Sequence, residues 1–95
     1  MACGVYLEHL ESPVHPDRPA RHYLGGAKDI SARHELHKSG QGAKMLRAAA
    51  ERGIGFEIVR VWECEPKEIW PLEKKLKRQR NHWKLCPICG AKGAR

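Results

Sequence analysis

The chain has 95 residues, with 18 Lys or Arg against 11 Asp or Glu, which gives a formal net charge of +7 at pH 7. This length predicts one small domain, and no apolar run approaches the roughly 20 residues that a membrane-spanning helix needs. The N-terminal residues lack the segments of a secretory signal, so we expect a cytoplasmic protein with no membrane partner. The basic excess favours a polyanionic partner, nucleic acid before others, although it also suits plain solubility.

Two strands are predicted near the N-terminus. Residues 4–10 and about 20–25 are rich in strand-forming side chains, and residues 11–20, which include three prolines, form an irregular loop between them. Gly25 and Gly26 follow, where glycine permits either a close backbone approach or a positive φ, unless they form a simple turn. Asp29 is the predicted N-cap of a helix over residues 30–38, whose N-terminus could also receive an anion.

The rest of the chain predicts two more helical regions and one more strand. Residues 43–51 are rich in alanine and favour a helix, residues 55–63 form a strand, and a last helical region runs from about residue 66 to residue 80. Pro71 leaves two alternatives there: a separate turn over residues 66–70 with Pro71 opening the helix, or one helix kinked at Pro71. The order β-β-α-α-β-α predicts an α/β fold of the α+β type.

Three short motifs occur in order along this pattern. Gly-Val-Tyr stands at residues 4–6, Tyr-Leu-Gly stands at residues 23–25, and Arg33 and His37 lie four apart on one face of the predicted helix. This order resembles the GIY-YIG nuclease family, a group of metal-dependent DNA endonucleases. The resemblance covers about residues 4–81, and the loop between the first two motifs is longer here than is usual in the family.

The resemblance implies both a fold and a domain layout. The family has a small three-stranded antiparallel sheet flanked by helices, here about three of them. We therefore expect a nuclease domain over residues 1–84. A basic C-terminal tail with a C-x-x-C would follow over residues 85–95.

The resemblance also implies a role for each motif residue. Tyr6 has the better claim to activate the attacking water, Tyr23 lies beside it to orient water or phosphate, and His37 polarises Tyr6 or the water. A free phenol has a pKa near 10, so a tyrosine that acts as a base needs a metal or a cation beside it. The alternative is that both tyrosines are ordinary strand aromatics with hydroxyls at the surface.

Arg33 and Glu73 complete the predicted catalytic set. A guanidinium offers two parallel donors to phosphate oxygens, which makes Arg33 the candidate to bind the scissile phosphate. Glu73 matches the helix that carries the metal-binding glutamate of the family, and one carboxylate with waters and a phosphate oxygen suits Mg²⁺ or Mn²⁺. The alternatives are a surface arginine and a solvated glutamate paired with Lys77 at i+4.

A dense basic cluster follows Glu73 and is expected to bind phosphates without regard to sequence, although most charge runs are solvated faces. Its members are Lys74, Lys75, Lys77, Arg78, Arg80 and Lys84. Asn81 resembles a family asparagine that stabilises the site, with a helix C-terminal asparagine as the alternative. The predicted nucleic-acid-binding residues are Gly25, Lys28, Lys74, Lys77, Arg78, Arg80 and Asn81.

The four cysteines are Cys3, Cys64, Cys86 and Cys89, and without a signal peptide reduced thiols or a metal site are favoured over disulfides. Cys86 and Cys89 form one C-x-x-C, which is half of a zinc site. Unliganded thiols are the default, and structural Zn²⁺ at Cys86 and Cys89 is the alternative. If the first and third strands pair antiparallel, Cys3 and Cys64 approach each other and all four cysteines could bind zinc.

Together with these patterns, the resemblance implies a metal-dependent DNA endonuclease, which would hydrolyse phosphodiester bonds by in-line attack of water at a single metal ion. The expected substrate is DNA, branched or otherwise structured, and a second copy of the chain or a specificity-giving protein is a further candidate partner. One alternative is a non-catalytic nucleic-acid-binding module that keeps the nuclease fold. Another is a protein-interaction module held together by metal at Cys86 and Cys89.

Overall fold

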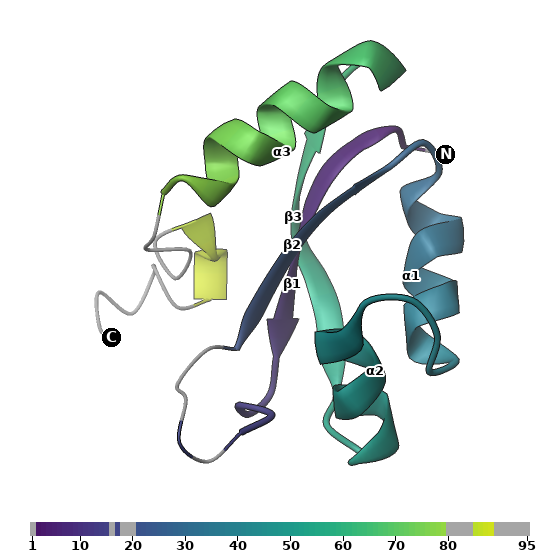
Figure 1. The fold of residues 1–95 in the computed structure, drawn as a ribbon, viewed down its shortest axis with the longest axis vertical. Coiled ribbons are helices and arrows are strands. Elements are labelled where there is room, and N and C mark those ends of the chain that lie inside the picture. The colour runs from purple at the N-terminus through teal and green to yellow at the C-terminus, as the bar shows by residue number, and fades with distance from the viewer. Residues whose placement is uncertain (1, 16, 18–20, 80–84, 89–95) are drawn as a thin grey trace.

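The computed structural model describes residues 2–15, 17, 21–79 and 85–88. Figure 1 shows three strands crossed by helices on both sides. The elements are β1 (Gly4–Leu10), β2 (His22–Ala27), α1 (Ile30–Lys38), α2 (Lys44–Glu51), β3 (Phe56–Glu63), a 3₁₀ turn η1 (Pro66–Glu68) and α3 (Ile69–Lys77). The predicted order β-β-α-α-β-α and the α+β class are confirmed.

The sheet has the order β2-β1-β3, and β1 pairs antiparallel with both neighbours. Tyr6 lies opposite Gly25 on one side and opposite Val61 on the other. A register shift between Leu7 and Glu8 interrupts the pairing with β3. The predicted three-stranded antiparallel sheet is therefore present, with its most buried strand in the middle.

Side chains of β1 alternate between two cores, because successive residues of a strand point to opposite faces. Val5 and Leu7 pack with Leu76 of α3, whereas Leu10 packs with Leu46 of α2. Figure 1 shows the same division, with α1 and α2 on one side of the sheet and α3 on the other. The sheet is thus a layer between two sets of helices, and β1 contributes to both interfaces.

Two helix starts follow from local chemistry. Asp29 caps α1 as predicted, since its side chain accepts a hydrogen bond of 3.1 Å from the backbone N–H of Ala32. Pro71 is the third residue of α3, after the separate turn η1, so neither predicted alternative describes it fully. The first N–H groups of a helix have no partner within it, so proline costs little there. The last helix ends at Lys77, earlier than predicted.

The C-terminal segment also packs on the sheet. Cys86 is fully buried in the cluster that contains Leu7 and Leu76, and Leu85 packs against the same cluster. In Figure 1 this short stretch lies on the α3 side of the sheet. The described part of the predicted tail is therefore joined to the domain core.

Replacing Leu7 by Ala should lower the free energy of unfolding by about 2–5 kcal/mol, because a fully buried side chain is lost and a cavity remains. Urea unfolding followed by circular dichroism measures this change. Leu36→Ala is the matched control. Leu36 is 40% exposed, so its loss should cost less than about 1 kcal/mol. Similar losses in both variants would contradict the assignment of Leu7 to the core.

Candidate active site

Three aromatic rings from three elements meet beside β2, the edge strand. Tyr6 of β1 and His37 of α1 are joined by a hydrogen bond of 3.0 Å between the phenol oxygen and Nε2. The ring centroid of Tyr23 lies 6.3 Å from that of Tyr6 and 5.8 Å from that of His37. The structure thus brings together the two tyrosines and the histidine that the motifs single out.

The direction of the Tyr6–His37 hydrogen bond follows from the second nitrogen of the imidazole. Nδ1 of His37 lies 3.3 Å from the backbone oxygen of Gln41, which can only accept, so Nδ1 carries the hydrogen and donates. Nε2 of the neutral ring is then an acceptor, and the hydroxyl of Tyr6 donates to it. Burial lowers the pKa of His37, so the ring is neutral near pH 7.

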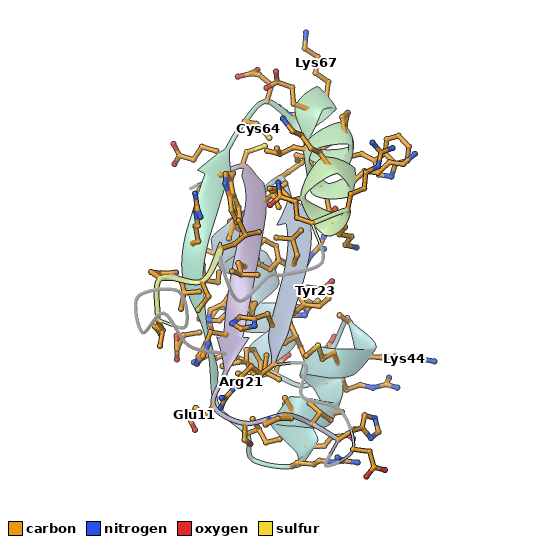
Figure 2. The ribbon with its side chains drawn as sticks, turned by 90° about the vertical axis from the view of Figure 1, so that its left-hand side faces the viewer. Glu11, Arg21, Tyr23, Lys44, Cys64 and Lys67 are labelled. Carbon is orange, nitrogen blue, oxygen red and sulfur yellow. The ribbon has the colours of Figure 1, made fainter. Side chains whose placement is uncertain are left out.

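The two tyrosines differ in their exposure to solvent. Tyr6 is fully buried, and burial raises the pKa of its phenol well above the usual value, a rise that the nearby Arg33 only partly offsets. Tyr23 is half-buried, and Figure 2 places it at the outer edge of the sheet. Burial raises the pKa of Tyr23 as well, with Lys77 opposing the rise. Tyr23 is therefore the more accessible of the two phenols.

Gly25 permits the close approach of these two tyrosines. A Cβ at Gly25 would lie 2.8 Å from Cε2 of Tyr23 and 2.9 Å from the hydroxyl oxygen of Tyr6. Gly25 lies within β2 and is not among the glycines with positive φ in the described chain. Of the interpretations that the sequence leaves open, the close backbone approach is the one observed.

Glu73 of α3 reaches the same edge of the sheet. A Cβ at Gly26 would lie 2.5 Å from Cγ2 of Ile69 and 3.0 Å from Oε1 of Glu73, so this glycine lets α3 settle on β2. Oε2 of Glu73 forms a 2.8 Å ion pair with Lys77, one turn further along the helix. This hydrogen bond raises the pKa of Lys77. The pairing with Lys77 that the sequence offers as an alternative role is therefore present.

The donor set around Glu73 fits a magnesium ion in type. Mg²⁺ binds oxygen ligands and is usually held by one or two carboxylates, with waters and substrate phosphates completing its shell. Glu73 is partly accessible, with 23% of its side chain exposed, and its Oε1 lies over the open backbone at Gly26. Any ion bound there would compete with the ammonium group of Lys77 for the carboxylate.

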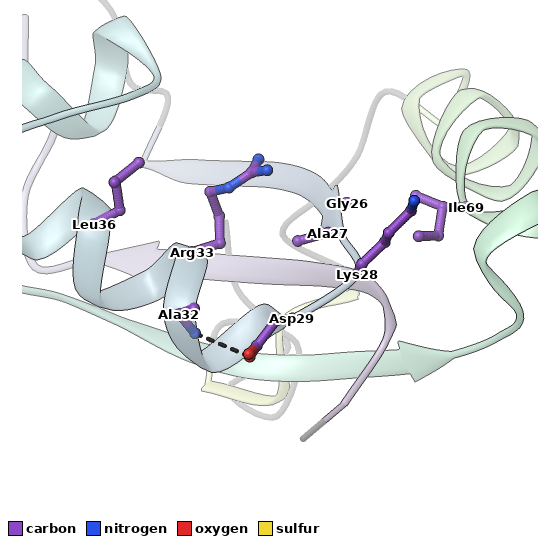
Figure 3. Close-up of a pocket in the computed structure, with 8 residues that line it drawn as sticks. All are labelled: Gly26, Ala27, Lys28, Asp29, Ala32, Arg33, Leu36 and Ile69. Carbon is purple, nitrogen blue, oxygen red and sulfur yellow. Dashed lines mark hydrogen bonds between the residues drawn. The ribbon is translucent and has the colours of Figure 1, made fainter.

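Arg33 and Lys28 line an open pocket of about 500 Å³ beside the start of α1. Figure 3 shows Arg33 and Lys28 on either side of Ala27, with Ile69 beside Lys28. The Asp29 carboxylate occupies the N-terminus of α1 through its bond to Ala32, marked by the dashed line. The N-terminus of α1 is thus capped by the chain's own Asp29. Lys28 and Arg33 are therefore the groups of this pocket that would attract a phosphate.

The predicted nucleic-acid-binding residues lie on β2, in the bend that follows it, and on or just after α3. Lys74 and Lys77 are exposed on α3 and Arg78 is exposed directly after it, whereas Lys28 is exposed beside the pocket and Gly25 is buried in β2. Arg80 and Asn81, like Lys84 and Cys89, lie outside the described residues. The sequence reasoning missed Trp70, which is 68% exposed and has the ammonium group of Lys74 4.8 Å from its ring centroid. A tryptophan shortly before a lysine-rich run was the signal available in the sequence.

Two further polar groups were not anticipated. Glu8 is fully buried, with Oε2 2.8 Å from Nδ1 of His34, while its Oε1 has no hydrogen-bond partner among the residues that the structure describes. Burial raises the pKa of Glu8, and the bond to His34 opposes that rise. The alternation of side chains along β1 could have indicated where Glu8 points, since Glu8 shares a face of the strand with Tyr6. The second group consists of His9, His22 and Cys86, whose ligand atoms all lie within 4.8 Å of one another.

The cysteines fall into two places. The backbone N–H of Cys64 donates to the backbone oxygen of Cys3, so these residues are neighbours, as antiparallel pairing of β1 and β3 predicts. Cys86 instead lies beside His9, six residues further along β1 from Cys3, which is roughly 20 Å at strand spacing. In this arrangement Cys86 does not share an ion with Cys3 and Cys64.

Comparison with protein-family models, curated proteins and solved structures finds no match to this chain. Within the described ranges, no helix is both long and apolar enough to cross a membrane. The resemblance to the GIY-YIG family therefore rests on the motif residues of the sequence and stays a prediction.

The buried, neutral His37 predicts that acid destabilises the fold. Burial lowers the pKa of His37 below its usual value of 6.5, so the unfolded chain takes up a proton at a higher pH than the folded chain does. From about pH 6.5 down to the folded pKa, the free energy of unfolding therefore falls as the pH falls. His37→Gln should remove this part of the slope in urea titrations at a series of pH values.

The control for this slope is His15→Gln, at an exposed loop position. This variant should keep the pH dependence of the wild type. If His37→Gln and the wild type lost stability equally on acidification, the buried neutral state of His37 would be excluded.

Proposed function

We propose that the chain is a metal-dependent endonuclease that hydrolyses phosphodiester bonds in DNA. The observation that carries the proposal is the convergence of five groups from four elements on the β2 edge of the sheet. They are Tyr6, Tyr23, Arg33, His37 and Glu73, and each has a use in phosphodiester hydrolysis. The resemblance to the GIY-YIG family predicts the same five residues.

Arg33 is proposed to hold the scissile phosphate. Its exposed guanidinium lines the pocket, acts electrostatically on both tyrosines, and can donate two parallel hydrogen bonds to phosphate oxygens. Lys28 lines the same pocket. The exposed Lys74 on α3 and Arg78 directly after it extend the positive surface for flanking phosphates, which gives salt-dependent binding without sequence specificity.

Glu73 is the residue that would hold a divalent ion, Mg²⁺ or Mn²⁺. Such an ion supplies stabilisation of the negative charge that develops on the phosphate and leaving oxygens. In the structure the ammonium group of Lys77 pairs with the carboxylate of Glu73. The same lysine lies near Tyr23, so its release from Glu73 would leave a cation free to contact the substrate.

Tyr6 and His37 form a proton relay in this proposal. The water's proton passes to the phenol oxygen of Tyr6 as the phenol proton passes to Nε2 of His37, along the hydrogen bond already present. The hydroxide attacks phosphorus in line, the bond to the leaving oxygen breaks, and the leaving oxygen takes a proton from solvent. The relay needs no standing phenolate, so the raised pKa of Tyr6 is compatible with it.

The second candidate is a nucleic-acid-binding module without catalysis. Two observations favour it: Tyr6 is closed from solvent, and Glu73 is already paired with Lys77. The basic face serves both functions equally. The nuclease proposal requires that water reach Tyr6 past Tyr23, which lies over the same glycine.

Nicking of supercoiled plasmid in Mg²⁺ or Mn²⁺ tests the nuclease. Glu73→Gln and Arg33→Ala should each slow cutting by about 10²–10³-fold, because each removes charge stabilisation in the transition state. Arg33→Ala should keep most DNA binding, since the lysines of α3 remain. Glu51→Gln, at an exposed position of α2, is the matched control and should cut at the wild-type rate.

Cutting by Arg33→Ala or Glu73→Gln at the wild-type rate would overturn the proposed roles. If the wild type bound linear, supercoiled and branched DNA but cut none of them, the binding module would replace the nuclease.

A further inference from the structure

The structure assigns a structural zinc site to His9, His22 and Cys86, on the α3 side of the sheet. His9 and His22 are directly opposite each other in the β1–β2 pairing, with ring centroids 5.2 Å apart. Cys86 is fully buried, and its Sγ lies 3.5 Å from Nδ1 of His9. Three zinc-ligating side chains from three separate segments therefore meet at one point. The assignment is independent of the proposed nuclease activity.

Two of the distances between the ligand atoms match those of a tetrahedral zinc site. With Zn–N bonds of about 2.0–2.1 Å and a Zn–S bond of about 2.3 Å, tetrahedral angles place two nitrogens roughly 3.3–3.4 Å apart and nitrogen and sulfur roughly 3.5–3.6 Å apart. Nδ1 of His9 lies 3.3 Å from Nε2 of His22 and 3.5 Å from Sγ of Cys86. The ligand atoms of the three residues all lie within 4.8 Å of one another.

Hydrogen bonding alone explains this cluster less well. A neutral imidazole nitrogen has either one hydrogen or one lone pair, so Nδ1 of His9 cannot make two full hydrogen bonds, to Nε2 of His22 and to the thiol of Cys86. An ion bound between the three atoms uses one lone pair from each. A bound metal would therefore use all three atoms at once.

The ligand chemistry selects zinc over the hard ions. Imidazole and thiolate are the ligands of structural zinc, whereas Mg²⁺ and Ca²⁺ take oxygen. Cys86 also belongs to a C-x-x-C, the spacing with which many zinc sites take two thiolates. Cys89 lies outside the described residues, and the assignment rests on the other three ligands.

Such a site would fasten the C-terminal segment to the sheet. It joins β1, β2 and the stretch around Cys86, next to a cluster of apolar side chains that includes Leu7 and Leu76. A domain of this length has a small core, and structural metals are a common means of stabilising such domains. Zinc binding here should therefore appear in folding stability.

Metal content of the purified protein and a cobalt titration test the site. The wild type should carry about one zinc per chain, and His9→Ala and Cys86→Ser should each retain less than about one tenth of that. Chelation of zinc should lower the thermal midpoint of the wild type by about 10 °C or more, and added Zn²⁺ should restore it. Cobalt added to the chelated wild type should give a thiolate-to-cobalt charge-transfer band and tetrahedral d–d bands.

Matched controls separate this site from other histidines and thiols. His15→Ala and Cys64→Ser should keep both the zinc and the cobalt bands, and His22→Cys should also bind, because a thiolate replaces the imidazole. Since a variant that fails to fold loses metal trivially, the wild-type cobalt spectrum is decisive. Absence of the charge-transfer band in the wild type, or its full retention in Cys86→Ser, would overturn the site.

Discussion

The burial of β1 on both faces is the constraint on which the structure depends. Its backbone groups pair with β2 and β3, and its side chains alternate between the helices on either side. Tyr6 faces α1 and meets His37, whereas His9, three residues later, faces the α3 side and meets Cys86. One central strand therefore supplies a group to each of the two proposed sites, and the odd spacing keeps these sites apart.

The protonation of the candidate active site is determined by the backbone as well as by side chains. The carbonyl of Gln41 accepts from Nδ1 of His37, and this leaves Nε2 to accept from Tyr6. The loop after α1 thus sets the tautomer, and the tautomer sets the direction in which the phenol proton points. Burial disfavours a phenolate at Tyr6. The proposed relay avoids that state, because Tyr6 receives a proton from water as it releases its own to Nε2 of His37, which later returns it to solvent.

Much of the fold could be predicted because its signals are local. Asp29 and the helix after it depend on a few neighbouring residues, and the order of the elements follows from periodicity and turn residues. The pairing of His9 with His22 depends instead on the strand register across a long loop with three prolines, which spacing alone does not determine. The burial of Tyr6 likewise depends on how α1 and β2 cover it, a tertiary property with no local signal.

The two proposed metal sites differ in chemistry in a way that keeps their ions separate. Glu73 offers a hard carboxylate oxygen that is partly open to solvent, whereas His9, His22 and Cys86 offer softer nitrogen and sulfur atoms. They are linked mechanically, because the same β1–β2 register that sets His9 opposite His22 also sets Tyr6 opposite Gly25. A link between the two strands and the C-terminal segment therefore holds the hairpin in the one register in which both tyrosines lie over a glycine. The proposed zinc site would thus stabilise the geometry of the candidate active site from the opposite face of the sheet.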